Sequence, residues 1–325
     1  MLTAQIGARR GAHRRSRLNL HAMFVETFGL RRDPFLDTAD PSFYYETISC
    51  AHAKRRLTEC LAQGRGLAVV VGPIGAGKTT LLNAAQEPLL EDERFLVAAV
   101  LDPSFGDEAE LLDGILGAFG FDAPAASGVR ARKDALKRAL FSSAIDEGRQ
   151  AVLFIDEAQT LSPALLESLR SLLNYQLDDR KLLSIVLAGQ PELADALRAQ
   201  PNFSDRIALL LQLRPLTESE AAAMLDHRLR RAGYARPDSP FGPGAATLLW
   251  RRAAGLPRRL TVLARESMEE AAQNGRTSVG EGDVDAAAAN FIGEPAAREE
   301  PPSTISDRQG PPPPMPWWMF WRRAS

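Results

Sequence analysis

The residues from 72 to 79 carry the clearest chemical signal in this chain, because they read Gly-Pro-Ile-Gly-Ala-Gly-Lys-Thr. This octet fits the phosphate-loop pattern G-x-x-x-x-G-K-[ST] at every position. Glycines allow successive N–H groups to turn inward around an anion, the lysine places a charge at the β- and γ-phosphates, and the threonine hydroxyl can bind magnesium. We therefore expect a nucleoside triphosphate to bind at Gly72, Pro73, Ile74, Gly75, Ala76, Gly77, Lys78, Thr79 and Thr80.

The flanking segments have the order that phosphate binding requires. Residues 66–71 form a short apolar run that is typical of a buried parallel strand. Residues 80–85 begin a helix, whose positive amino end would face the phosphates. This strand–loop–helix context favours a phosphate loop over a glycine-rich turn that happens to contain a lysine.

Two acidic residues, Asp156 and Glu157, end another apolar run, which covers residues 151–156. In ATPases with a phosphate loop, such a strand delivers an aspartate to the magnesium ion, and a following polar residue orients the attacking water. We expect Asp156 to bind magnesium and Glu157 to activate water. Phosphoryl transfer depends mainly on positioning and charge neutralisation, so these few groups suffice for the chemistry.

Three further side chains are candidates for contact with the γ-phosphate, and two of them also have a purely structural interpretation. Gln190 follows the apolar run 183–189 and either senses the γ-phosphate or is a strand-end glutamine in a turn before proline. Arg206 precedes the next run and is either an arginine finger for a neighbouring subunit or a surface arginine at a helix end. Arg258 begins a helix in the second domain, from which its guanidinium can reach back to the γ-phosphate.

These residues need an α/β scaffold, and the patterning predicts one. Apolar runs at 66–71, 95–102, 151–156, 183–189 and 209–214 alternate with helical patterns at 108–120 and 130–147. Such alternation predicts a parallel sheet with helices on both faces. Thr217 and Glu220 form a capping-box pattern, after which the chain is helical in character. The predicted fold is a P-loop NTPase sheet followed by a smaller all-α lid.

We divide the chain into four parts: a basic extension (1–22), a nucleotide-binding α/β domain (23–216), a helical lid (217–292) and a proline-rich tail (293–325). The extension holds five arginines and no acid. It is either a basic arm that binds nucleic acid or binds an anionic membrane face, or it precedes a true translation start at Met23. In the tail, Trp317, Trp318 and Trp321 suit a membrane interface, a docking peptide for a partner groove, or a disordered end without function.

Composition narrows the classes of protein to which this chain can belong. The 325 residues are 45% hydrophobic and 25% charged with a formal net charge of −2, so no global basic field favours nucleic acid. Cys50 and Cys60 are expected to be free thiols of a reducing compartment. No apolar run reaches the about 20 residues that a membrane-spanning helix needs. We expect a cytoplasmic protein.

The ordered motifs resemble the AAA+ ATPases of the ExeA/GspA general-secretion type, which include relatives at pilus and exosortase loci. The resemblance covers residues 23–292. It rests on Phe28-Gly-Leu with Asp33-Pro-Phe, residues 72–80, Ile155-Asp-Glu-Ala-Gln159, Val186-Leu-Ala-Gly-Gln-Pro-Glu-Leu193, Leu213-Arg-Pro-Leu216 and Gly255-Leu-Pro-Arg258. The Gly-Gln-Pro-Glu-Leu and Asp-Glu-Ala-Gln pieces are the most specific, since the phosphate-site motifs occur in many ATPases.

The resemblance implies ATP and Mg²⁺ as ligands, a homo-oligomer, and inner-membrane secretion or export components as partners, with the protein cytoplasmic or peripheral on that membrane. It implies Lys78 and Thr79 at phosphate and magnesium, Asp156 at magnesium and Glu157 activating water. It further implies sensor positions for Gln190 and Arg258 and a finger position for Arg206. Longer members continue into a membrane span and a peptidoglycan-binding domain. The resemblance does not extend to those parts, so it implies no periplasmic role for this chain. The alternative functions are an AAA+ ATPase acting on DNA and a switch with negligible turnover.

Overall fold

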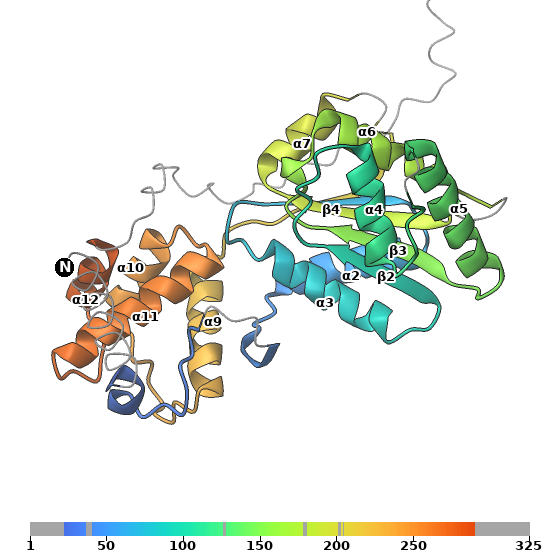
Figure 1. The fold of residues 1–325 in the computed structure, drawn as a ribbon. Coiled ribbons are helices and arrows are strands. Elements are labelled where there is room, and N and C mark those ends of the chain that lie inside the picture. Colours follow the sequence, from blue (N-terminus) through green and yellow to red (C-terminus); the bar gives the residue numbers. More distant parts are fainter. Residues whose placement is uncertain are drawn as a thin grey trace, which may run out of the picture. The chain divides into compact units, whose positions relative to one another are not determined.

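The computed structural model describes residues 23–36, 41–125, 128–177, 181–200, 203 and 205–289 (Figure 1). The expectations for the basic extension 1–22 and for the tail 293–325, with its tryptophans, lie outside the described residues. All structural statements below concern the described part of the chain.

A five-stranded sheet forms the centre of the nucleotide-binding region. Its strands are β1 (Leu67–Val71), β2 (Phe95–Val100), β3 (Gln150–Ile155), β4 (Leu183–Gly189) and β5 (Ile207–Gln212). They lie in the order β2-β3-β4-β1-β5, and every neighbouring pair is parallel. The three interior strands are buried along nearly their whole length, which explains why their sequences read as continuous apolar runs.

Helices cover both faces of this sheet, because alternate residues of each strand point to opposite sides. Leu67, Val69 and Val71 of β1 belong to one hydrophobic cluster, and Ala68 and Val70 belong to another. The first cluster includes side chains of α4 (Glu108–Ala118), α5 (Val129–Ile145), α6 (Pro163–Leu172) and α7 (Pro191–Arg198). The second includes side chains of α2 (Ile48–Ala62) and α3 (Lys78–Leu90). The predicted α/β class is confirmed (Figure 1).

After β5 the chain is helical, as the capping pattern predicts. The helices are α9 (Glu218–Arg231), α10 (Pro243–Arg252), α11 (Pro257–Gln273) and α12 (Glu281–Ala289). The Thr217 hydroxyl accepts a hydrogen bond from the Glu220 N–H, and the Glu220 carboxylate accepts one from the Thr217 N–H at 2.9 Å. This reciprocal pair confirms the predicted capping box and determines where α9 begins.

The amino-terminal segment (residues 23–36 and 41–47) packs with these helices. Phe24, Phe28, Phe35 and Phe43 are buried in the same hydrophobic cluster as the apolar faces of α9, α10, α11 and α12. Backbone contacts add to this packing, because the Arg31 N–H donates to the Ala232 carbonyl at 2.7 Å. The sequence division assigned this segment to residues 23–216; its apolar side chains contribute to the core of the helical region.

Glu220 connects the segments that precede and follow the sheet. Its carboxylate accepts hydrogen bonds from both Arg214 guanidinium NH2 groups at 2.9 Å and from the Ser49 hydroxyl at 3.4 Å. Ser49 lies at the start of α2 and Arg214 directly after β5. One capping carboxylate therefore holds both chain connections between the sheet and the helical region. Nowhere in the described ranges does a helix combine the length and apolar character needed to cross a membrane.

Candidate nucleotide-binding site

The phosphate-loop octet connects β1 to α3, as the sequence predicts. Gly75 and Gly77 have φ values of 79° and 93°, in the left-handed region that favours glycine. Gly72 is required for a different reason, since a Cβ there would lie 3.0 Å from the Leu213 Cβ. The Gly72 N–H donates to the Gly189 carbonyl at 3.2 Å, which ties the start of the loop to the end of β4. The loop is thus anchored to the sheet and curled by its glycines.

Lys78 begins α3 and is 5% exposed. Its ammonium group donates to the carbonyls of Gly72 at 2.9 Å and Pro73 at 3.1 Å. Burial lowers the pKa of Lys78 below its ordinary value, while the nearby carboxylates of Glu157, Asp156 and Glu192 act in the opposite direction. Because both hydrogen-bond acceptors are neutral carbonyls, the charge of Lys78 remains available to an anion in the loop.

Thr79 and Asp156 meet at the end of β3. The Thr79 hydroxyl donates to the Asp156 carboxylate at 2.5 Å, although the two residues are far apart in sequence. Asp156 is 4% exposed, and its N–H donates to the Val100 carbonyl at 2.9 Å. A hydroxyl and a carboxylate are the hard oxygen donors that magnesium prefers, so this pair fits that ion. Magnesium binds through one or two such protein ligands together with substrate phosphates.

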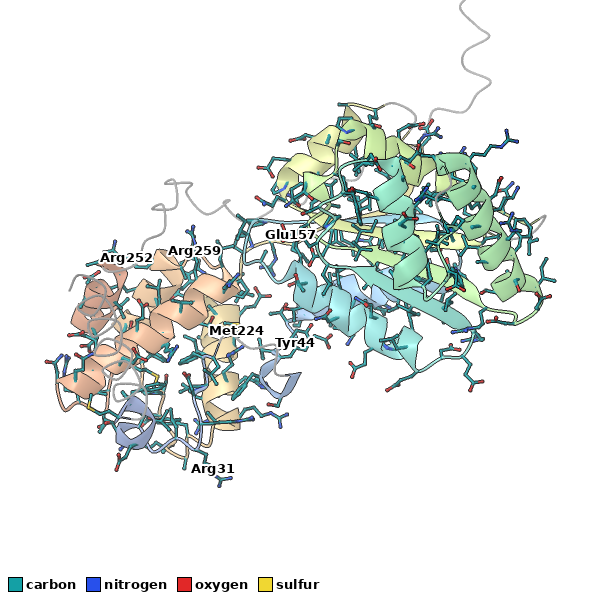
Figure 2. All side chains as sticks on the ribbon, in the orientation of Figure 1. Arg31, Tyr44, Glu157, Met224, Arg252 and Arg259 are labelled. Carbon is teal, nitrogen blue, oxygen red and sulfur yellow. The ribbon has the colours of Figure 1, made fainter. Side chains whose placement is uncertain are left out.

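Glu157 leaves the strand in an unusual conformation. Its φ and ψ are 50° and 31°, the left-handed region that non-glycine residues adopt infrequently. Its side chain is exposed beyond the end of β3 (Figure 2), and its carboxylate accepts a hydrogen bond from the Gln159 amide at 2.6 Å. Its N–H donates to the Asp156 carboxylate at 2.9 Å. The tight turn separates the two acids, so Asp156 is buried while Glu157 faces solvent.

Gln190 lies beside this group because of the strand order. β4 pairs with both β1 and β3, and Gly189, its last residue, is level with Val71, the last residue of β1. Gln190 follows as the residue that precedes α7, and its N–H donates to the side-chain carbonyl of Gln159 at 3.0 Å. The structure therefore places Gln190 between the strand that carries Asp156 and the strand that leads into the loop.

Arg258 reaches the loop from the helical region. It is the second residue of α11, after Pro257, and its N–H donates to the Gly75 carbonyl at 3.3 Å. A Cβ on Gly75 would lie 3.1 Å from the Arg258 Cβ, so the backbones are close at this point. The amino end of α11, which carries a partial positive charge, is thus in contact with the phosphate loop.

Arg206 is the one predicted residue that the structure does not bring to this group. It precedes β5, whose first residue Ile207 is paired with Leu67 at the amino end of β1. The phosphate loop follows the carboxyl end of β1, which at about 3.3 Å per residue is roughly 16 Å further along the strand. Arg206 is exposed at the opposite end of the sheet, where the strands begin.

Gln159 is a residue of this group to which the sequence analysis assigned no role. Its amide contacts the Glu157 carboxylate and the Gln190 N–H at the same time. The sequence shows only a polar residue two positions after Glu157. Its proximity to Gln190 arises from the pairing of β3 with β4, which no local pattern indicates.

The parallel sheet, the loop after β1, the acids after β3 and the helical region after β5 together give this chain the fold of the AAA+ class of P-loop NTPases. The family model described as "AAA domain" matches residues 61–197. Its range begins in α2 and ends in α7, so it includes the loop, both acids and Gln190.

Within the AAA+ class, the resemblance to the general-secretion type is confirmed. The chain is 32% identical over 274 residues to General secretion pathway protein A of Aeromonas hydrophila, an alignment that covers 83% of this chain and 49% of that protein. The chain thus spans about half the length of this curated relative.

Solved structures of related fold come from the archaeon Aeropyrum pernix. The ORC1 protein in complex with DNA superposes with a TM-score of 0.59 at 20% identity, over 79% of this chain and 69% of that one. The ORC2 protein in ADPNP–ADP complexes superposes with a TM-score of 0.56 at 19% identity, over 76% and 70% of the two chains. At these identities the likeness shows the fold alone.

Proposed function

We propose that this chain binds ATP together with Mg²⁺ at the loop after β1 and hydrolyses it. The observation that carries the proposal is the convergence of Lys78, Thr79, Asp156 and Glu157 at the carboxyl edge of one parallel sheet. Ligands of open α/β sheets bind at this edge. The loop has the curled backbone and the buried lysine that a polyphosphate requires.

In this proposal each group has one task. The N–H groups of residues 72–80 and the Lys78 ammonium bind the phosphates, and Thr79 and Asp156 hold the metal. A bound magnesium ion would neutralise charge on the β- and γ-phosphates. Glu157 accepts a proton from the attacking water. Gln190 and Arg258 respond to the γ-phosphate from the end of β4 and from α11, which couples the helical region to the state of the nucleotide.

We further propose that the active form is a homo-oligomer. Arg206 is exposed at the far edge of the sheet from its own loop, so its guanidinium can act only on the nucleotide of another copy. An arginine supplied in trans stabilises the charge that develops during phosphoryl transfer. The position of Arg206 is therefore consistent with an arginine finger and inconsistent with action in its own site.

The resemblance to General secretion pathway protein A supports a role in energising or switching an envelope secretion, export or assembly system. We place the protein in the cytoplasm or at the inner face of the inner membrane, with secretion or export components of that membrane as partners. Trp317, Trp318 and Trp321 would make a membrane-surface contact.

The second candidate is an AAA+ ATPase that acts on DNA. The likeness in fold to a DNA-bound protein and the arginines near the ends of α10 and α11, of which Figure 2 labels Arg252 and Arg259, favour testing it. DNA binding through phosphates weakens steeply with salt. A steep loss of duplex binding between low and moderate salt would support this candidate. ATPase stimulation by anionic liposomes without DNA binding would support the secretion role.

The replacement of Glu157 by Gln tests the hydrolytic assignment. Loss of the base is expected to slow hydrolysis by about 10²- to 10⁴-fold, while the affinity for ATP stays the same because Lys78 and Thr79 are intact. Steady-state phosphate release and equilibrium binding of labelled ATP measure the two quantities. The matched control is Glu147→Gln, which changes an exposed glutamate before β3 that pairs with Arg149 at 3.1 Å. Undiminished hydrolysis in Glu157→Gln would refute the assignment, and a wild-type protein that binds ATP without turnover would be a switch.

A further inference from the structure

We propose that Gln159 is a positioning residue that fixes the orientation of the Glu157 carboxylate relative to the end of β4. The inference rests on the proposed ATPase function, since it concerns the base of that reaction. It adds a residue that acts through Glu157 rather than on the reacting atoms. Its role is to connect the residue that activates water with the backbone of the residue that senses the phosphate.

The hydrogen bonds of Gln159 determine the orientation of its amide. The Gln190 N–H can only donate, so the atom 3.0 Å from it must be the Gln159 side-chain oxygen. The Gln159 NH₂ group therefore faces the Glu157 carboxylate, which can only accept, at 2.6 Å. Both ends of the amide have the complementary partner, and a flipped amide would oppose donor to donor and acceptor to acceptor.

Glu157 is a residue that needs such support. It is exposed and follows the strand in a left-handed conformation. Its backbone N–H is held by the Asp156 carboxylate, but that bond leaves the Glu157 side-chain torsions free to rotate. An exposed glutamate samples several rotamers, and ordering its side chain costs conformational entropy. A fixed donor that contacts one carboxylate oxygen reduces that freedom before substrate arrives.

Gly189 has no side chain and so leaves room for the Gln159 amide beside β4. A Cβ on Gly189 would lie 2.7 Å from the Gln159 side-chain oxygen, 2.9 Å from the Leu193 Cδ2 and 3.2 Å from the Gln159 backbone nitrogen. Gly189 is part of β4, so its role here is close approach and not a left-handed backbone. Its carbonyl accepts the N–H of Gly72, the first residue of the phosphate loop. The series Glu157–Gln159–β4 end–Gly72 therefore connects the base to the loop without any group of the substrate.

The primary experiment compares Gln159→Met with wild type. Methionine keeps the length of the side chain and removes both hydrogen bonds. We expect kcat for ATP to fall by about 10- to 100-fold, because a misplaced base loses most of its advantage, while KM and the affinity for a non-hydrolysable ATP analogue change by less than about threefold.

The matched control is Thr160→Val. The Thr160 hydroxyl donates to the Glu157 backbone carbonyl at 2.9 Å, so this variant removes a neighbouring bond that does not touch the carboxylate. We expect it to retain kcat within about twofold, since the lost hydrogen bond is at the surface and does not contact the reacting groups. Melting temperatures of all variants show whether each protein is folded.

The split between kcat and the affinity for the analogue distinguishes positioning from general structural support. A role in packing alone would lower the melting temperature of Gln159→Met and leave kcat per folded molecule at its wild-type value, and that result would overturn the inference.

The remaining outcomes separate this inference from the proposed function. If wild type hydrolyses ATP, Glu157→Gln is inactive and Gln159→Met retains full kcat, the inference on Gln159 is wrong and the ATPase assignment stands. If Gln159→Met loses analogue binding in proportion to kcat, Gln159 supports the binding site and the inference is also wrong. If Glu157→Gln hydrolyses ATP like wild type, the proposed function itself fails.

Discussion

The two ends of the parallel sheet differ in how completely they are organised. At the carboxyl end, Lys78, Thr79 and Asp156 are joined in short hydrogen bonds to one another or to the loop backbone. At the amino end, Arg206 and Lys181 lie near each other, and neither forms an ion pair within the residues that the structure describes. Burial, with the charge of Arg206 acting in the same direction, lowers the pKa of Lys181.

In the proposed function, this difference divides the chemistry between copies of the chain. The carboxyl end contains its own charge balance, with cation, carboxylates and curled backbone in one place. At the amino end, Arg206 and Lys181 contribute positive charge without an ion-pair partner among the described residues. In the proposed function these two ends meet only between subunits, because one sheet cannot bring both of its ends to a single nucleotide.

The largest effect in this comparison is expected when Arg206 is replaced by Ala. If Arg206 serves the site of another copy, hydrolysis should fall by about 10³-fold, with ATP affinity unchanged because the carboxyl end is intact. The control is Arg94→Ala, since Arg94 lies before β2 at the same edge and already pairs with Asp92 at 2.6 Å. Phosphate release by the two variants under saturating ATP gives the comparison. Equal rates in wild type and Arg206→Ala would remove the amino end from the mechanism.

A mixing experiment sharpens the same prediction. Arg206→Ala retains its loop, and Lys78→Ala retains its arginine, so mixed oligomers contain sites in which both are present. Activity should reappear when the two inactive variants are combined. If each variant is inactive alone and the mixture stays inactive, while mixed oligomers are shown to form, the finger does not act in trans.

A smaller effect is expected at the carboxyl end when Thr79 is replaced by Val. The change removes the hydroxyl bound to the buried Asp156 carboxylate and with it one proposed magnesium ligand. Loss of a hydrogen bond to a buried charged group costs about 1–3 kcal/mol. The Mg²⁺ concentration for half-maximal hydrolysis should rise by about 10- to 100-fold. Thr79→Ser, which keeps the hydroxyl, should behave like wild type, and an unchanged Mg²⁺ dependence in Thr79→Val would contradict the assigned ligand.

The smallest expected effect lies away from both ends, at Thr217. Thr217→Ala removes the helix cap of α9 and should lower the free energy of unfolding by about 1 kcal/mol. Turnover per folded molecule should stay close to wild type, which separates lost stability from lost chemistry. Ser219→Ala, two residues further along the exposed first turn, should change stability by less than about 0.5 kcal/mol. Chemical denaturation followed by circular dichroism measures both variants.

Much of the scaffold follows from local sequence patterns. The interior strands are continuous apolar runs because both of their faces are covered, and the observed β1, β3 and β4 lie where those runs were found. β5 begins at Ile207, two residues before the predicted run, because an edge strand buries alternate residues and its ends carry a weaker signal. The α9 cap was likewise visible, since a capping box is a contact between residues three apart.

Other features could not be predicted in this way, because they depend on contacts between distant segments. The sequence division joined residues 23–43 to the sheet domain, whereas Phe24, Phe28, Phe35 and Phe43 are buried among α9 to α12. Gln159 belongs to a motif of the resemblance, but its contact was not predicted, because its partner Gln190 follows a neighbouring strand. The roles assigned to Gln190, Arg206 and Arg258 remain predictions, and the experiments above test the role of Arg206.

By itself, the sequence determined that this chain has a phosphate loop, two acids after a buried strand, and an α/β sheet followed by helices. These follow from backbone freedom at glycine, hydrogen-bonding chemistry and hydrophobic periodicity, which act over a few residues. Only the tertiary structure decided that Thr79 meets Asp156, that Gln159 bridges Glu157 and Gln190, and that Arg206 faces away from its own site. Strand order and register place residues that are far apart in the chain, and no local pattern encodes them.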